Sequence, residues 1–178
     1  MLVKYVNNPA HLFLDNTPYF ITAIIYQKRH LLAKDDVKYY LLSVIKESFA
    51  NKGWILNDWV ILNNHYHLLV VSNKGKDLSK IMSRIHMLSA QFICKELNAE
   101  KPIWWNYWDY CPRNERDYFV HLNYLFNNPV KHGYVANLLD YPFSSFSQLL
   151  EMQGRDNLVN QFRGYSEYKC LQLVEDDF

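Results

Sequence analysis

Glycine, proline and cysteine are all scarce in this chain, with 5, 6 and 3 copies among 178 residues. The cysteines are odd in number and widely separated, and no two form a Cys-x-x-Cys pair, which argues against a zinc ribbon and a disulfide framework. They are Cys94, Cys111 and Cys170. A Gly-x-x-x-x-Gly-Lys stretch is also missing, so the sequence offers no loop that would cradle the phosphates of a nucleotide.

Long apolar runs and a secretion signal are absent as well. No run approaches the about 18 residues that a membrane span requires, and the chain does not open on a signal peptide. We therefore expect a cytoplasmic protein without a membrane partner. Neither sign of charge dominates, because 19 basic and 18 acidic residues leave a net charge of +1. That balance argues neither for nor against a nucleic-acid partner.

Aromatic side chains are abundant, with 14 Tyr, 10 Phe and 5 Trp. This composition is typical of a folded chain and argues against disorder. No linker or repeat divides the sequence, so residues 1–178 are expected to form a single domain. Aromatics are densest in segment 102–110. We expect most of these rings to pack a loop onto the core, and one or two to contact unpaired bases.

Hydrophobic periodicity predicts the order strand, helix, hairpin, helix and helix. The strand is expected at 19–26, the first helix from Asp35, the hairpin at 54–72, and the later helices at 78–97 and 113–129, the last stopped by Pro129. This order predicts an α+β fold, an α/β sandwich built on a mainly antiparallel sheet.

His65 and His67 stand one residue apart in the second arm of the expected hairpin. The preceding Asn63-Asn64 tolerates left-handed backbone conformations and predicts a tight turn. A strand places residues i and i+2 on one face, about 6.6 Å apart, which is close enough to share a metal ion. Tyr66 would then face the core. The alternative is that both histidines simply lie on a solvated face.

Tyr124 stands on a polar strip of the third expected helix. Its helical neighbours at i−7, i−3 and i+4 are Asp117, His121 and Asn128. A tyrosine between histidine and asparagine on a polar face is an unusual way to fill a core, although an amphipathic tyrosine at the core edge fits the pattern equally well.

Basic residues gather in short groups. Four of the residues from 74 to 84 are basic against one acid, which predicts either a solvated face or a phosphate-binding stretch. The turn after the first expected strand is basic too. The candidate DNA-binding residues are Lys28, Arg29, Lys74, Lys76, Lys80, Arg84, Lys131 and His132.

Together these motifs resemble the REP-associated tyrosine transposases, which are single-tyrosine, insertion-sequence-type transposases of the HUH nuclease superfamily (His, hydrophobic residue, His). The resemblance covers about residues 15–150, which would form the catalytic core and leave 151–178 as a C-terminal extension. The residues that carry it are His65-Tyr66-His67, Tyr124-Leu-Phe-Asn-Asn-Pro-Val130, Gly133 and Tyr141-Pro-Phe-Ser-Ser145.

The resemblance implies a ferredoxin-like antiparallel sheet with the histidine strand at its centre and the tyrosine on a helix packed nearby. It also implies the cutting and rejoining of single-stranded or hairpin DNA through a covalent 5′-phosphotyrosine, with Mg²⁺ or Mn²⁺ as cofactor. Tyr124 would be the nucleophile, and His65, His67 and Asn128 would be the metal ligands. His121 is a candidate to help Tyr124 ionise, and a structural histidine fits that position as well.

The sequence departs from the family pattern in places. Tyr66 fills the middle of the triplet, and Lys131-His132 stands where Arg-Ala is common, so His132 would add a metal ligand or a phosphate contact. Because the residue before proline is biased away from the helical conformation, Pro129 predicts some distortion of Asn128 from its i+4 alignment with the tyrosine.

Two other functions stay open. A protein of the same fold would bind structured DNA without cutting it, although retention of both histidines and the tyrosine favours an active nuclease. A two-histidine phosphoesterase for small cyclic nucleotides would carry tandem His-x-Thr or His-x-Ser motifs, and neither is present here. A homodimer that exchanges its tyrosine helices and a monomer are both compatible with the sequence.

Overall fold

The computed structural model describes residues 13–173; residues 1–12 and 174–178 of the predicted domain lie outside the described residues. Within this range the chain forms an antiparallel sheet in the order β2-β3-β1-β4. The strands are β1 (Pro18–Ile25), β2 (Ile55–Ile61), β3 (His65–Val71) and β4 (Trp104–Tyr110). The histidine strand β3 therefore lies inside the sheet, paired on both sides.

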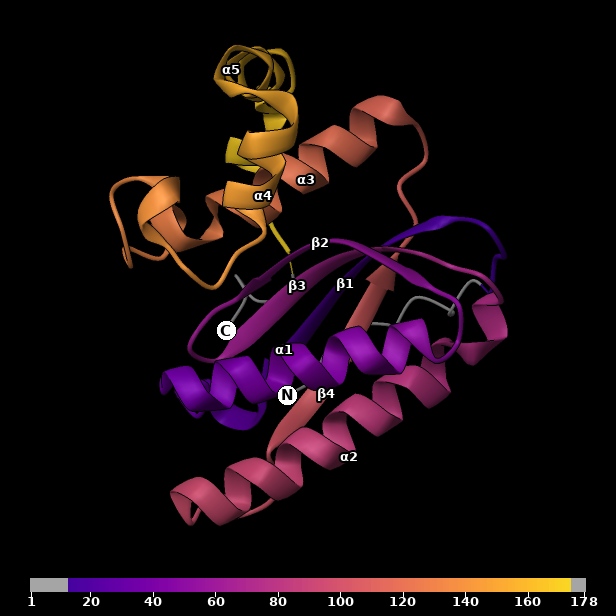
Figure 1. Cartoon of the computed structure of the whole chain (residues 1–178), viewed down its shortest axis with the longest axis vertical. Helices are drawn as coiled ribbons and strands as arrows, with labels where there is room; N and C mark the ends of the chain where they lie inside the picture. The colour runs from indigo at the N-terminus through magenta and orange to yellow at the C-terminus, as the bar shows by residue number, and fades with distance from the viewer. Residues whose placement is uncertain (1–12, 174–178) are drawn as a thin grey trace, which may run out of the picture.

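Helices cover both faces of this sheet (Figure 1). On one face lie α1 (Asp35–Ala50) and α2 (Leu78–Leu97), and on the other lie α3 (Glu115–Lys131), α4 (Phe146–Gln153) and α5 (Arg155–Gly164). Short 3-10 turns are η1 (Tyr26–Lys28), η2 (Gly75–Asp77), η3 (Leu138–Asp140) and η4 (Ser166–Cys170). The β-α-β-β-α-β order confirms the expected α+β, ferredoxin-like architecture. Among the helices of residues 13–173, none combines the length and apolarity needed to cross a membrane.

The strand β1 is buried on both sides and holds the layers together. The Tyr19 ring lies 5.4 Å from that of Trp54, which in turn packs against Phe49 of α1. The next residue, Phe20, faces the opposite layer, where its ring lies 6.3 Å from that of Tyr124 on α3. Because neighbouring side chains of a strand point to opposite faces, an apolar run broken only by Thr22 suits a strand enclosed between two helical layers.

The aromatic segment 102–110 forms the edge strand β4, which corrects the predicted loop. Its aromatic rings pack against helices on both faces of the sheet. Trp104 stacks on His86 of α2 at a centroid distance of 4.6 Å, and Tyr110 stacks on His121 of α3 at 4.7 Å. Because large rings stand on both faces, the segment lacks the apolar–polar alternation by which a half-exposed strand is predicted.

The predicted end of the third helix at Pro129 is wrong, because α3 continues to Lys131 with the proline inside it. The helix ends in a Schellman motif, in which Tyr134 N donates to Pro129 O at 2.8 Å and Gly133 N donates to Val130 O at 3.0 Å. Gly133 supplies the left-handed φ of +73° that this cap needs. The proline removes one hydrogen bond of α3, the one that its N–H would donate to the carbonyl of Leu125, and the helix nevertheless continues for two more residues.

After α3 the chain returns to the open edge of β2. Ile61 N donates to Phe143 O at 2.9 Å, and Ser145 N donates to Trp59 O at 3.0 Å. The Tyr141 hydroxyl donates to Ile61 O at 2.7 Å. The Tyr-Pro-Phe-Ser-Ser motif therefore covers an edge strand that would otherwise present unpaired backbone groups.

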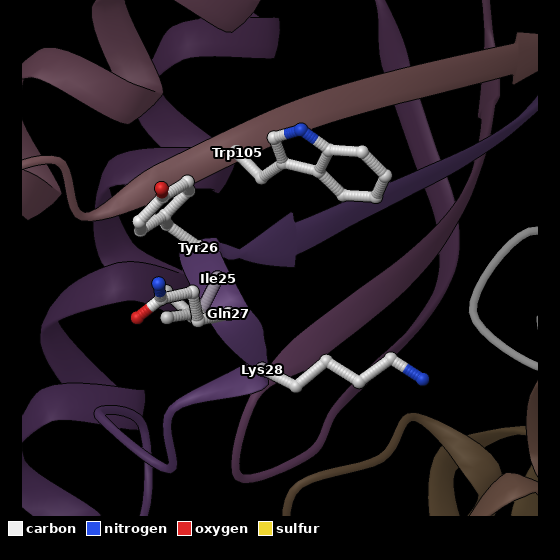
Figure 2. A pocket seen from close by; sticks show the side chains of 5 residues that line it. All are labelled: Ile25, Tyr26, Gln27, Lys28 and Trp105. Carbon is white, nitrogen blue, oxygen red and sulfur yellow. The ribbon is translucent and has the colours of Figure 1, made fainter. Parts of the chain in front are cut away.

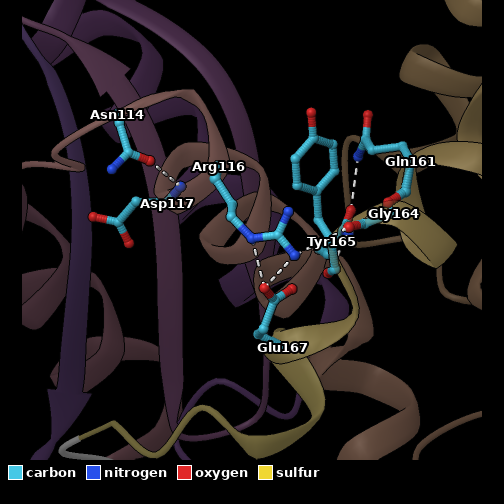
Figure 3. Close-up of polar contacts among 8 residues, drawn as sticks. Asn114, Arg116, Asp117, Gln161, Gly164, Tyr165 and Glu167 are labelled. Carbon is cyan, nitrogen blue, oxygen red and sulfur yellow. Dashed lines mark hydrogen bonds and ion pairs between the residues drawn. The ribbon is translucent and has the colours of Figure 1, made fainter.

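The C-terminal segment supports α3 from the side away from the sheet. Arg116 Nε donates to Glu167 Oε1 at 2.6 Å, as Figure 3 shows. Gln161 Nε2 donates to Asn123 Oδ1 at 2.7 Å, and both side chains are buried. Asn123 directly precedes Tyr124, so these contacts fix the helix at the turn that carries the candidate nucleophile.

Candidate active site

The two histidines of β3 point toward α3, as their spacing predicts. Their rings lie 5.1 Å apart, and both side chains are buried. Tyr66 points to the opposite layer, where its hydroxyl lies 3.4 Å from Nε2 of His86. Burial lowers the pKa of His86 to about 3, so this histidine is neutral beneath the sheet. Because His65 and His67 are both buried, the alternative that they lie on a solvated face is wrong.

Neighbouring side chains fix the orientation of both imidazoles. The Nδ1 atom of His67 lies 2.8 Å from Oγ1 of Thr22 on β1, its cross-strand partner. The Nδ1 atom of His65 lies 2.7 Å from Oδ1 of Asn64. With each Nδ1 engaged in this way, Nε2 is the ring atom oriented for an external ligand. In metal-binding histidines the second ring nitrogen usually meets a carboxylate, a backbone carbonyl or water, and here a hydroxyl and an amide oxygen take that position.

The turn that precedes His65 is held rigidly. Leu32 N donates to Asn63 O at 2.9 Å, and Ile25 N donates to Asn64 O at 2.8 Å. The buried ammonium of Lys38 donates to Asn63 Oδ1 at 2.8 Å, and burial lowers the pKa of this lysine. Neither asparagine adopts a positive φ, so the tolerance of asparagine for left-handed backbone is not used here.

The helix α3 brings Tyr124 and Asn128 onto the histidines. The rings of Tyr124 and His67 lie 5.6 Å apart, edge to face. Asn128 Nδ2 donates to the carbonyl of Tyr124 at 3.0 Å, which leaves its Oδ1 at 3.4 Å from Nε2 of His65. The asparagine is helical and fully buried, so the distortion expected from the following proline does not occur.

The C-terminal end of α3 forms the solvent-facing side of the site. Lys131 Nζ donates to the Tyr124 hydroxyl at 2.9 Å and lies 4.5 Å from the centre of its ring. The His132 ring lies 5.1 Å from that of His65. Both Lys131 and His132 are exposed, so this end of the site faces solvent.

These residues offer a donor set for a divalent cation. His65, His67 and Oδ1 of Asn128 supply two imidazoles and one amide oxygen, a mixture that suits Mn²⁺ and accommodates Mg²⁺. Among residues 13–173, no group of three or more His, Cys, Asp or Glu side chains is placed to hold a metal ion. Asn128 is the candidate for a protein oxygen ligand because its Oδ1 lies 3.4 Å from Nε2 of His65.

Residues 15–118 match the family described as "Transposase IS200 like", a span that contains both histidines and ends before Tyr124. The chain belongs to the IS200-like transposase family. It is 29% identical over 136 residues to the "REP-associated tyrosine transposase" of Escherichia coli (strain K12), covering 75% of this chain and 79% of that one. A solved structure described as "Structure of the REP associates tyrosine transposase bound to a REP hairpin" superposes with a TM-score of 0.65 at 26% identity, covering 83% of this chain and 84% of that one.

In this IS200-like transposase, His121 is held between α3 and the sheet. Its Nδ1 lies 2.8 Å from the carbonyl oxygen of Asp117, and its ring stacks on Tyr110. Burial lowers the pKa of His121. The Tyr124 hydroxyl accepts a hydrogen bond from Lys131, and the helper role of His121 stays a prediction.

The structure distributes the basic residues of the transposase over both faces. Lys131 and His132 border the site, and Asn64 Nδ2 donates to the carbonyl of Lys28 at 3.3 Å, which places Lys28 beside the histidine turn. The guanidinium of Arg29 binds other parts of the protein, because it donates hydrogen bonds to the carbonyls of Glu100 and Pro102.

The stretch from 74 to 84 does not reach the site. It follows the end of β3 opposite to His65 and runs into α2, on the other face of the sheet. Arg84 in this stretch pairs with Glu47 of α1 at 2.6 Å. A phosphate bound by these lysines would therefore lie far along the strand from the histidines.

Sequence reasoning missed Thr22 and Lys38 as residues that support the site, and it named Asn64 only as part of a turn. Thr22 left a usable signal, since it is the one polar side chain between apolar residues in Tyr19-Phe-Ile-Thr-Ala-Ile-Ile25. Its contact with His67 depends on strand pairing over 45 residues of sequence, which the sequence alone does not fix.

Proposed function

We propose that this transposase cuts and rejoins single-stranded DNA through a covalent 5′-phosphotyrosine on Tyr124, with Mg²⁺ or Mn²⁺ held by His65, His67 and Asn128. The observation that carries the proposal is the convergence of a buried phenol, two oriented imidazoles and an amide oxygen at the solvent-facing end of α3. The family membership and a relative solved with a REP hairpin support hairpin-forming repeats as the substrate class.

The chemistry follows from the position of each group. The phenolic oxygen of Tyr124 loses its proton and attacks the phosphorus, the bond from phosphorus to the 3′-oxygen breaks, and the 3′-oxygen takes up a proton and leaves as a hydroxyl. Lys131 Nζ donates to the phenolic oxygen at 2.9 Å, so an ammonium group faces the atom that would attack. A bound divalent cation would polarise the phosphate and stabilise the charge that develops on its oxygens.

Rejoining is the reverse reaction. The phosphotyrosine retains the energy of the phosphodiester, so a 3′-hydroxyl attacks it and reseals the strand without a nucleotide cofactor. The phenolic oxygen that is bonded to phosphorus in this intermediate is the leaving group of the reverse reaction, and the Tyr124 ring that carries it packs against Phe20 and His67.

A denaturation-resistant adduct tests this proposal. The probe is a labelled oligonucleotide that forms a hairpin with a single-stranded extension, chosen from any inverted repeat found beside the gene and incubated with Mg²⁺ or Mn²⁺. Wild type is expected to form the adduct, Tyr124→Phe is not, and Tyr118→Phe on the same helix is expected to retain it. An adduct with Tyr124→Phe would assign the nucleophile elsewhere. Tight hairpin binding with no adduct in either ion would instead make the protein a non-cleaving DNA binder.

A further inference from the structure

A β-bulge turns one tryptophan of β4 out of the regular sheet pattern. Ile24 pairs with Asn106 and Ile25 with Trp104, so Trp105 is the extra residue on β4. Its side chain is 43% exposed, and its ring meets that of Trp108 edge to face at 5.1 Å. Bulges of this kind re-aim a side chain and are frequent beside active sites. Trp105 thus presents a large flat surface to solvent.

The turn η1, which lies opposite Trp105, has a strained backbone. Gln27 and Lys28 in η1 have φ values of +56° and +51°, a conformation that side-chain-bearing residues rarely adopt. The turn is tied to the start of β4, because Tyr26 N donates to Ile103 O at 2.8 Å and the Arg29 guanidinium donates to Pro102 O. The fold therefore fixes a costly conformation at this place.

Between Trp105 and this turn lies a pocket of about 360 Å³, lined by Ile25, Tyr26, Gln27, Lys28 and Trp105. Figure 2 shows Trp105 on one side and Lys28 on the other, with Tyr26 and Gln27 grouped at one end. A pocket of this volume lies in the range of small-ligand sites. It combines an aromatic wall, a side-chain amide and a cation.

The pocket adjoins the histidine end of the site. Asn64 Nδ2 donates to the carbonyl of Lys28 at 3.3 Å, and Oδ1 of the same asparagine lies 2.7 Å from Nδ1 of His65. A single side chain therefore touches both the pocket turn and a candidate metal ligand. A ligand in the pocket would sit next to whatever occupies the histidine site.

We propose that this pocket binds one unpaired base of the DNA strand beside the phosphate that is cut. The base stacks on Trp105, the Gln27 amide meets its polar edge, and the Lys28 ammonium contacts the backbone phosphate. A flat aromatic wall next to a cation is the combination that single-stranded DNA requires, because every base has a π-face and every linkage a negative charge. The inference rests on the proposed function, in which a single strand enters the histidine site.

Affinity measurements test the base pocket in the full chain. The probe is a hairpin oligonucleotide with a single-stranded extension, bound without divalent metal so that no cleavage intervenes. Trp105→Ala is expected to weaken binding about 5- to 150-fold, the effect of losing one base stack. The control is Tyr39→Ala, which removes a ring of 61% exposure on α1, on the other face of the sheet. It is expected to change the affinity less than twofold.

A scan with abasic nucleotides separates stacking from general damage. In wild type, one abasic position in the extension is expected to weaken binding by the same factor as Trp105→Ala. In the Trp105→Ala protein, that position is expected to have no further effect. Equal losses at every position in both proteins would overturn the proposal, and so would unchanged affinity of a Trp105→Ala protein that unfolds at the wild-type urea concentration.

The remaining outcomes also decide the question. If Trp105→Ala dissociates a dimer without weakening DNA binding, the pocket is a contact between copies and the proposal fails. If the abasic effect appears but no phosphotyrosine forms on Tyr124, the base pocket stands and the nuclease assignment falls. If the adduct forms at the wild-type rate and affinity with Trp105→Ala, the nuclease assignment stands and the base pocket falls.

Discussion

At the scale of single residues, the candidate nucleophile is held by packing and by charge at once. Tyr124 is 1% exposed, with its ring against Phe20 and His67 on the sheet side. On the solvent side Lys131 contacts both the hydroxyl and the face of the ring. Lys131 is therefore a candidate for two roles, assistance of the phenol and contact with DNA phosphate, and a substitution separates them.

Replacement of Lys131 tests its action on the phenol. Lys131→Met is expected to slow adduct formation at saturating DNA by about 100-fold, the typical effect of removing one charge-stabilising donor. Lys131→Arg keeps the charge and an N–H donor, and is expected to stay within about tenfold of wild type. The measurement is the single-turnover rate of adduct formation. A Lys131→Met protein with weaker DNA binding but an unchanged saturated rate would reduce the lysine to a phosphate contact.

At the scale of elements, the position of α3 depends on how the chain after it is tied to the sheet. Segment 141–145 lies along the edge of β2, where Ser145 Oγ donates to Asp58 Oδ1 at 3.1 Å and accepts from Trp59 N at 3.0 Å. Burial raises the pKa of Asp58 from 3.8 to about 6, against the lowering effect of the serine hydrogen bond. The contact between segment 141–145 and β2 therefore contains a carboxyl group, that of Asp58, whose ionisation is disfavoured.

The raised pKa of Asp58 makes the free energy of unfolding fall as pH rises. The folded state binds the Asp58 proton more tightly than the unfolded state, so the protein loses free energy of unfolding as pH rises from about 4 to about 6. Asp58→Asn removes the ionisation and is expected to raise the free energy of unfolding by about 2 kcal/mol more at pH 8 than at pH 4. Urea titrations at both pH values measure this difference. Exposed Asp140→Asn is the control, and an equal effect of Asp58→Asn at both pH values would contradict the expectation.

At the scale of the whole molecule, the sheet separates two surfaces that carry basic residues. The site, Lys28 and Lys131 lie at the end and face served by α3, whereas the stretch from Lys74 to Arg84 lies on and before α2. The net charge of +1 does not reveal how the basic residues are distributed, because it is summed over both surfaces. Electrostatic attraction of DNA should therefore depend on which lysines are removed, and not merely on how many.

Salt dependence of DNA affinity distinguishes the two surfaces. Replacing Lys28 and Lys131 by Gln is expected to lower the slope of log Kd against log salt by about 1.4, or about 0.7 for each lost single-strand phosphate contact. The matched pair Lys76→Gln and Lys80→Gln removes the same charge from the α2 side and is expected to leave the slope unchanged. An equal fall for the second pair would show that DNA wraps onto the α2 surface.

Much of the site was predictable because its parts are local in sequence. The alternation of a strand places His65 and His67 on one face whatever surrounds them, and helical spacing relates Tyr124 to Asn128 in the same way. Helix α2 was also predicted with its observed ends, since its periodic apolar positions span Leu78–Leu97. The assignment of catalytic and ligand roles stays a prediction.

The sequence by itself determined which side chains share a strand face or a helix face, because backbone geometry repeats every two or 3.6 residues. The tertiary structure alone decided what those faces meet. It paired Thr22 with His67, made the aromatic segment an edge strand, and brought Lys131 to the phenol at the end of a helix that continues through Pro129. Such contacts join residues distant in the chain, and their energy depends on packing that no local pattern records.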